Sequence, residues 1–183
     1  MTIDKLQATA ALNDIERVIQ RLKQSQIYRN ASVLLMMWGA VVACAYLATY
    51  FAPRQAGLIW IAFQLAGLVA TGFLSVRNST GSLRGFDVRL TGALLLFFAF
   101  GLLWSVVIGK FGPREMNAFW ATLFMFGYCI AGLWFGRAFI ALGVTITVLT
   151  MVGYLWAGSL FEPYMALVNG GGLVLCGLLM RRA

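Results

Sequence analysis

Residues that could carry out chemistry are few, and most stand at the ends of long apolar runs. The chain has no histidine, and its six acids are Asp4, Asp14, Glu16, Asp87, Glu115 and Glu162. Acid–base catalysis commonly uses paired carboxylates and proton relays use buried acids, but these acids lie outside the apolar runs or at their ends. Because histidine is the commonest general base and metal ligand, we expect no enzyme, no catalytic residues, no metal site and no cofactor.

Other polar groups lie within the apolar runs and are uncharged. The candidates are Gln64, Asn117 and Asn169. Intramembrane amides either line a path for an uncharged solute or join neighbouring helices by hydrogen bonds, and the sequence leaves both uses open. The three cysteines show no metal-ligand or disulfide spacing and are expected to act as small apolar residues: Cys44, Cys129 and Cys176.

Composition places the chain in a membrane. Hydrophobic residues make up 61% of it and charged residues 11%, against about 45–50% and about 25% in soluble domains. Six apolar runs are each long enough to cross a bilayer as a helix: about 30–51, 55–76, 90–110, 115–136, 138–159 and 163–180. A spanning chain must satisfy its own backbone, so the sequence predicts an all-α integral membrane protein with six transmembrane helices.

Basic residues are distributed unevenly about these runs. Five precede the first run, three lie between the second and third, one lies between the fourth and fifth, and two follow the sixth, eleven in all. The other side carries only Arg54, Lys110 and Arg114. The positive-inside rule then predicts that both termini lie in the cytoplasm. The net charge of +8 is therefore a topology signal, and no nucleic-acid partner is expected.

An internal repeat relates the first four runs. A shift of sixty positions places "FAPR" at 51–54 on "FGPR" at 111–114, and a third turn reads "FEP" at 161–163. Matches in one register over two spans are the trace of a duplicated helical hairpin. We expect three parallel hairpins, at about 30–77, 90–137 and 138–182, related by an axis along the membrane normal.

The repeated turn has a physical interpretation. Proline is favoured at the first position of a helix, so Pro53, Pro113 and Pro163 are predicted to start the second helix of each hairpin. Arg54 and Arg114 then stand beside a helix N-terminus, whose outward donors suit a lipid phosphate. The alternative is that both arginines only extend to the membrane interface.

Small residues recur where helices are expected to meet. Gly132 and Gly136 are four residues apart, a spacing that lets helices pack closely in lipid. The "NGGG" at 169–172 lacks the lysine and following hydroxyl residue of a nucleotide loop. We expect it to be a close-contact or locally loosened stretch within a span.

The segment before the first span has an apolar stripe. Leu12, Ile15, Ile19 and Leu22 recur at spacings of three and four, with charged residues between them, which predicts an amphipathic helix over about 4–28. Residues 1–29 are thus expected to form a cytoplasmic element and 30–183 the membrane domain. The stripe could lie on the membrane surface, dock on the bundle's own loops, or pair with a helix of a second copy or another cytoplasmic protein.

With three hairpins and an aromatic-x-proline turn in each, the chain resembles the bacterial HdeD-type six-span proteins. The resemblance implies a multi-pass protein of the bacterial inner membrane with a role in envelope or acid-stress physiology, and it supplies no catalytic residues. The chain departs from the family pattern in two ways. The proline is followed by Arg54, Arg114 or Tyr164 rather than by glycine, and the amphipathic segment before the first span is not part of the family pattern.

Two functions remain open from the sequence. The first is a non-enzymatic inner-membrane bundle that interacts with membrane lipids, with itself or with a partner through residues 4–28. The second is a passive channel or facilitator for a small neutral or anionic solute, suggested by the repeat and the intramembrane amides.

Overall fold

The chain is helical throughout the part that the structure describes. The structure is a computed structural model that describes residues 5–78 and 88–182, with side chains described for 28–76 and 92–181. Within these residues, five helical stretches are long and apolar enough to cross a membrane: Tyr28–Phe51, Pro53–Val76, Pro113–Phe135, Arg137–Trp156 and Gly158–Arg181. A sixth apolar helix, Gly92–Ile108, is shorter. The all-α class and the presence of several membrane-spanning helices are confirmed.

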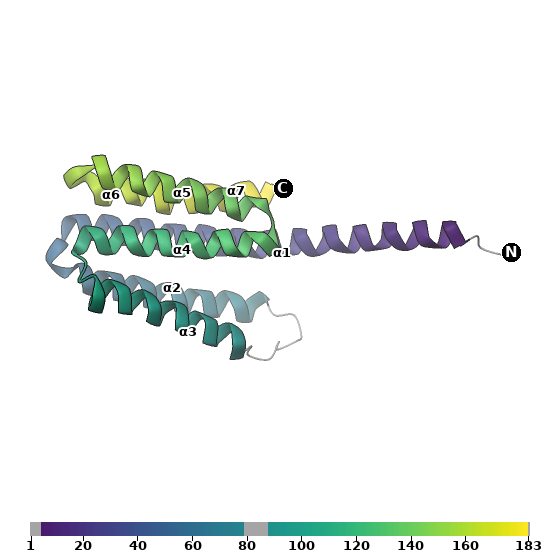
Figure 1. The fold of residues 1–183 in the computed structure, drawn as a ribbon, viewed down its shortest axis with the longest axis horizontal. Coiled ribbons are helices and arrows are strands. Elements are labelled where there is room, and N and C mark those ends of the chain that lie inside the picture. The colour runs from purple at the N-terminus through teal and green to yellow at the C-terminus, as the bar shows by residue number, and fades with distance from the viewer. Residues whose placement is uncertain (1–4, 79–87, 183) are drawn as a thin grey trace.

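Helix α1 (Lys5–Phe51) is a single helix of 47 residues. It joins the expected amphipathic segment to the first span without a break at residue 29, because no glycine or proline occurs between Lys5 and Trp38 to end it. A helix rises 1.5 Å per residue, so α1 is about 70 Å long. Figure 1 shows its amino-terminal part continuing in line with the span and leaving the bundle.

Three turns meet at one end of the bundle, which we call the turn end (Figure 1). The first leads through η1 (Pro53–Gln55) into α2 (Ala56–Asn78), and the second leads from α3 (Val88–Leu102) and η2 (Leu103–Ile108) into α4 (Pro113–Phe135). The third leads from α5 (Arg137–Trp156) through η3 (Gly158–Leu160) into α6 (Phe161–Met165). At the opposite end, which we call the terminal end, α1 enters the bundle and the last helix finishes.

The prolines of these turns follow the sequence prediction in two cases. Pro53 is the first residue of η1 and Pro113 the first residue of α4. Pro163 does not start its helix, because α6 begins two residues earlier, at Phe161. The first turn of a helix contains N–H groups without intrahelical partners, so proline at the third position removes no helix hydrogen bond.

The linkage between α4 and α5 corrects the expected role of one glycine. Gly136 is the single residue between the two helices and has a φ of 126°, a conformation that side chains disfavour. It forms the turn rather than a packing seam. Gly132 does pack as expected, since a Cβ added there would lie 2.8 Å from the backbone nitrogen of Ile140.

The closest helix pairs are α4 with α5, and α1 with the last helix of the chain, which is built from η4 (Ala166–Gly171) and α7 (Gly172–Arg182). Glycines allow these backbones to approach. A Cβ at Gly143 would lie 2.6 Å from the carbonyl oxygen of Met125, and one at Gly170 would lie 2.8 Å from Cα of Ala43. The segment η4 is a π-helix, so the expectation of a close and loosened stretch at 169–172 is confirmed.

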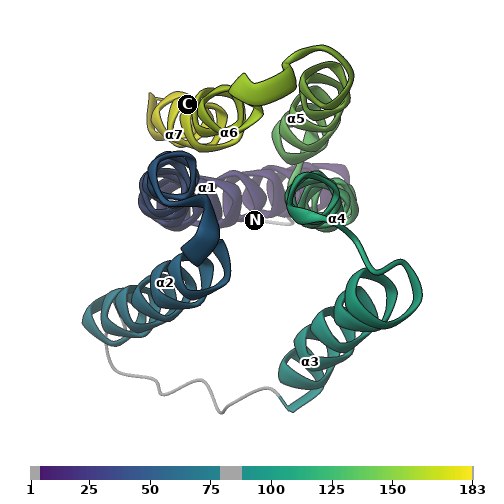
Figure 2. The ribbon, with the colours of Figure 1, turned by 90° about the vertical axis from the view of Figure 1, so that its left-hand side faces the viewer.

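Helices α2 and α3 lie on the side of α1 and α4 that is opposite α5 and α7, as Figure 2 shows in an end view. Trp38 of α1 packs against Gly67 of α2, where an added Cβ would lie 2.7 Å from the indole ring. Gly127, which the sixty-residue shift aligns with Gly67, has nothing within 4 Å of such an atom. The first two hairpins therefore use one repeated position differently.

Two buried clusters occupy the two halves of the bundle. The cluster nearer the terminal end is apolar, and its members are Leu35, Met125, Phe139, Leu142, Ile146, Leu173 and Met180. The cluster nearer the turn end consists of Tyr46, Ala118, Ala121, Phe161, Met165 and Ala166. Buried polar side chains adjoin this second cluster.

Candidate functional site

Arg114 reaches from α4 across the turn end toward α5 and α6. Its guanidinium carbon lies 5.2 Å from the ring centre of Tyr154 and 5.3 Å from that of Phe161. An Nη2 hydrogen is donated to the backbone carbonyl of Tyr154. Because the last carbonyls of a helix lack intrahelical partners, Arg114 caps the carboxyl end of α5 from a neighbouring helix. Its Nε is buried without a hydrogen-bond partner.

Glu162 lies in the first turn of α6 beside this arginine. Asn117 of α4 donates from Nδ2 to both carboxylate oxygens, at 2.9 and 3.0 Å. Arg114 lies within electrostatic reach of the carboxylate. An acid in the first turn of a helix also faces the positive end of the helix dipole. The Arg114 and Glu162 charges thus compensate each other at the turn end.

Tyr46 of α1 connects this pair to deeper polar groups. It is 1% exposed, and its hydroxyl donates to the Asn117 backbone carbonyl at 3.5 Å. The same hydroxyl lies next to the Asn169 side chain. Its ring meets that of Trp60 edge to face, with centroids 4.9 Å apart. We call Tyr46, Arg114, Asn117, Glu162 and Asn169 the polar cluster.

Some of the buried polar atoms in this half of the bundle have no hydrogen-bond partner among the residues that the structure describes. They are Trp60 Nε1, Arg114 Nε, Thr150 Oγ1 and Asn169 Oδ1. A buried polar atom without a hydrogen bond is costly, and each such case calls for an explanation. All four belong to the turn-end half or its margin, and none belongs to the apolar cluster.

The structure brings together some of the predicted site residues and separates others. Tyr46 contacts Asn117 at its backbone carbonyl and Asn169 at its side chain, whereas Gln64 lies on α2 outside the polar cluster and is half-buried. Arg54 is exposed on η1, while Arg114 is turned inward. Lipid-headgroup binding by either arginine stays a prediction. The side chains of Leu12, Ile15, Ile19 and Leu22 lie outside the described residues.

Sequence reasoning missed Glu162 and both tyrosines of the site. In the sequence Glu162 is one of several acids at span ends, and the proline is the distinctive residue of the "FEP" turn. An acid in the first turn of a helix, level with an asparagine of another span, would have been the signal for Glu162. Tyr46 and Tyr154 carried no comparable signal, because an aromatic residue in a span is usually packing.

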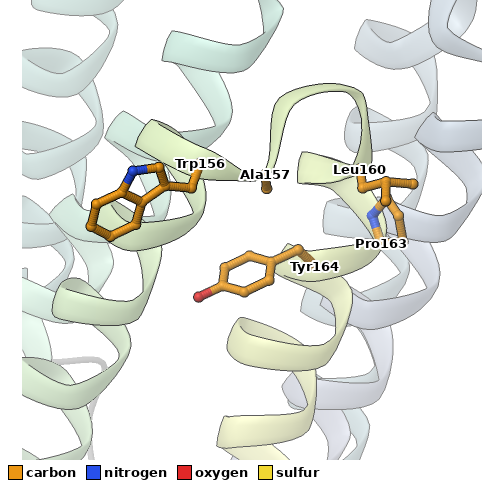
Figure 3. Close-up of a pocket in the computed structure, with 5 residues that line it drawn as sticks. All are labelled: Trp156, Ala157, Leu160, Pro163 and Tyr164. Carbon is orange, nitrogen blue, oxygen red and sulfur yellow. The ribbon is translucent and has the colours of Figure 1, made fainter.

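A shallow pocket lies at the turn that joins α5 to α6 (Figure 3). It has a volume of about 490 Å³ and is lined by Trp156, Ala157, Leu160, Pro163 and Tyr164. The Tyr164 hydroxyl is already used, since it donates to the Leu149 carbonyl at 2.8 Å. The remaining lining is mainly apolar, so the pocket offers hydrophobic contact and no reacting group.

The chemistry available at the polar cluster is hydrogen bonding and charge compensation. Among the described residues no three His, Cys, Asp or Glu side chains are grouped as metal ligands would be. Comparisons of the chain with known protein families, with curated proteins and with solved structures gave no match. The function must therefore be argued from the chain's own geometry.

Proposed function

We propose that this chain is a non-enzymatic, multi-span protein of the bacterial inner membrane that holds its amino-terminal helix out from the membrane to engage a partner helix. The observation that carries the proposal is α1, one unbroken helix that crosses the bundle and continues beyond it (Figure 1). A helix collinear with its span stands away from the membrane plane. This geometry favours a partner over the membrane surface or the bundle's own loops.

The apolar stripe identifies the contact. Leu12, Ile15, Ile19 and Leu22 share one face of the extended segment by their spacing. The segment from Lys5 to Ile27 is about 35 Å long at 1.5 Å per residue, and Figure 1 draws it clear of the other helices. An apolar stripe on a helix that leaves the bundle would be buried by a second helix, from another copy or from a cytoplasmic protein.

The interior of the bundle supports a scaffold rather than a conduit. Polar side chains gather near the turn end, while the half nearer the terminal end is closed by Leu35, Phe139, Leu142 and their neighbours. Large side chains such as Met125 and Phe139 are buried there at 1% and 6% exposure. Ion or solute passage along this axis would require the apolar cluster to open.

The topology forms part of the proposal. We infer six spans in three parallel hairpins, with both termini in the cytoplasm. The shorter helix formed by α3 and η2 is one of the six and the third along the chain. Arg29, Arg137 and Arg181 belong to the terminal end, whereas Arg54, Lys110 and Arg114 belong to the turn end. Each group lies on the side to which the sequence assigns it, and the count of eleven basic residues against three agrees with the positive-inside rule if the terminal end faces the cytoplasm.

Lipid contact and physiology complete the proposal. Large apolar side chains are exposed along α2, α3 and η2, among them Leu58, Val69, Phe73, Leu96 and Val107, as lipid-facing helices require. Arg54 stands exposed at the turn end, where a headgroup phosphate would meet it. The resemblance to HdeD-type proteins suggests envelope or acid stress as the setting.

The partner helix is tested by a matched pair of substitutions. Ile19→Asp places a charge in the apolar stripe, and Gln24→Asp places one about 140° away around the helix. If α1 binds a partner, Ile19→Asp should abolish chemical cross-linking through residues 5–27 in native membranes, and Gln24→Asp should leave it unchanged. Equal cross-linking in both variants would refute the proposal.

A second candidate function is supported by the Tyr46 hydroxyl, which lies between the Asn117 backbone carbonyl and the Asn169 side-chain amide. A passive facilitator for a small neutral solute would use such groups as its binding point. Purified protein in liposomes would then pass the solute faster than empty liposomes, Asn169→Leu would abolish the flux, and Gln64→Leu, outside the polar cluster, would not. Flux equal to that of empty liposomes eliminates this candidate.

A further inference from the structure

Thr150 differs from other hydroxyl residues of the bundle. Thr49, Thr71, Ser105 and Thr122 each donate to the carbonyl four residues earlier in their own helix, at 2.7 to 2.9 Å. This local bond is the usual solution for a hydroxyl within a helix. Thr150 is 0% exposed and its Oγ1 has no partner within the chain. Its hydroxyl is thus free to bond something else.

Asn169 presents a second buried group without a partner. It is 5% exposed, one end of its amide lies next to the Tyr46 hydroxyl, and Oδ1 has no partner. Turning the amide by 180° exchanges the two ends and still leaves one of them unpaired. Asn169 lies within the π-helix η4, and π-helical turns are frequent at functional sites.

The packing of α5 on the last helix brings these two residues to one level. A Cβ at Gly172 would lie 3.1 Å from Cδ1 of Ile146, so these positions face each other. Thr150 is one helical turn beyond Ile146, and Asn169 lies three residues before Gly172. Because the two helices run antiparallel, both steps lead toward the turn end and bring Thr150 and Asn169 to a similar level of the bundle.

The packing of α4 on α5 independently places Thr150 at the level of the buried cluster nearer the turn end. A Cβ at Gly143 would meet the Met125 carbonyl at 2.6 Å. Thr150 lies seven residues, or two turns, after Gly143, and Ala118 lies seven residues before Met125. Thr150 and Ala118 are therefore at the same level. Ala118 belongs to the same buried cluster as Tyr46 and Ala166. The surroundings of Thr150 are therefore buried and made partly of small side chains.

We propose that Thr150 and Asn169, with the Tyr46 hydroxyl beside them, form a buried binding site for a water molecule or a neutral solute of similar size. A hydroxyl can both donate and accept, and either end of an amide can be satisfied by a group that does both. Water needs about two to four polar partners at a buried position, which these residues supply.

The charges nearby determine the class of ligand. The charges of Arg114 and Glu162 compensate each other at the turn end. The Asn117 amide already donates to both carboxylate oxygens of Glu162. A charged ligand would lack a counter-charge, and burying an isolated charge is far more costly than burying a neutral polar molecule. The site therefore takes an uncharged ligand that forms hydrogen bonds.

The test is Thr150→Val, which keeps the shape of the side chain and removes the hydroxyl. If a ligand bonds Oγ1, the unfolding midpoint of the full chain in detergent micelles should fall by about 3 °C or more, and Thr150→Ser should stay near the wild type. Thr49→Val is the matched control, because that hydroxyl is buried and bonds only its own helix. The unfolding midpoint of Thr49→Val should fall less than that of Thr150→Val.

A second variant and an added solute complete the experiment. Asn169→Ser shortens the amide and should also lower the midpoint more than Thr49→Val does. If the ligand is a solute, glycerol or acetamide should raise the wild-type midpoint saturably and leave that of Thr150→Val unchanged; if it is water, the two midpoints should shift in parallel. A Thr150→Val midpoint equal to or above that of the wild type would overturn the proposal, since removing an unpaired buried hydroxyl is then neutral or stabilising.

Discussion

Asn117 holds Glu162 by one amide nitrogen that lies 2.9 and 3.0 Å from the two carboxylate oxygens, so the first turns of α4 and α6 are joined across the bundle. The two residues are 45 positions apart in the chain. The same two turns carry Arg114 and Phe161, which are in contact. The turn end is therefore cross-linked by polar side chains rather than by apolar packing alone.

Removing the carboxylate charge should weaken this link. Hydrogen bonds to charged groups contribute about 1.5–3 kcal/mol, so Glu162→Gln should lower the free energy of unfolding by about 1–2 kcal/mol. Glu115→Gln is the control, because Glu115 is an exposed acid in the first turn of α4. Unfolding midpoints in detergent micelles measure both, and an equal loss in the two variants would contradict the proposed role of the Asn117 contact.

Arg114 should not be replaceable by lysine. Its planar guanidinium lies against two rings and donates to a helix-end carbonyl, and an ammonium cannot reproduce that combination. We expect Arg114→Lys to lower the unfolding midpoint by about 2–4 °C. The exposed Arg54 serves as the comparison, since Arg54→Lys should leave the midpoint unchanged. A midpoint for Arg114→Lys equal to that of the wild type would show that only its charge matters.

The contact between α1 and η4 should tolerate no side chain at Gly170. An added Cβ would lie 2.5 Å from that of Ala43 and 2.8 Å from its Cα, so Gly170→Ala forces two backbones apart. We expect a clear loss of folded protein, measured by size-exclusion chromatography. Gly72 of α2 has nothing within 4 Å of such an atom, and Gly72→Ala should stabilise the helix by about 0.5–1 kcal/mol. Loss of folding in both variants would point to a general effect of adding a methyl group.

The inferred topology predicts which ends of the bundle a membrane-impermeant thiol reagent reaches. Arg54→Cys, at the turn end, should be labelled in intact spheroplasts, and Arg181→Cys, at the terminal end, only after permeabilisation. Both residues are exposed. The wild type is the control for its three free cysteines, Cys44, Cys129 and Cys176. The reverse labelling pattern would invert the proposed orientation.

Much of the helical layout could be predicted because it depends on local sequence. The apolar runs of about 20 residues match the span needed for a membrane, and Pro53 and Pro113 mark helix starts because their missing N–H groups are not needed there. Pro163 marked its helix start only to within two residues, since the first turn as a whole tolerates proline. The amphipathic segment and the first span form one helix, α1, because a change from polar to apolar composition does not interrupt helical hydrogen bonding.

The polar cluster could be predicted only in part. Asn117 and Asn169 were recognisable as polar residues within apolar runs, but nothing in their spacing indicated that Tyr46 would bring them together. Gln64 had the same sequence signature and lies elsewhere. The inward orientation of Arg114 was equally hidden, because the repeat treats it as equivalent to Arg54.

The sequence by itself determined that this is an all-helical membrane protein with turns at Pro53, Pro113 and Pro163 and a long amphipathic lead into the first span. Hydrophobic length, charge asymmetry and proline chemistry act within a few residues, so they can be recognised along the chain. Only the tertiary structure decided that α1 pairs with α7, that α4 pairs with α5, and that polar groups from α1, α4 and α6 share one end. Those choices depend on which small residues let two backbones approach, and that is a property of pairs of helices rather than of any one segment.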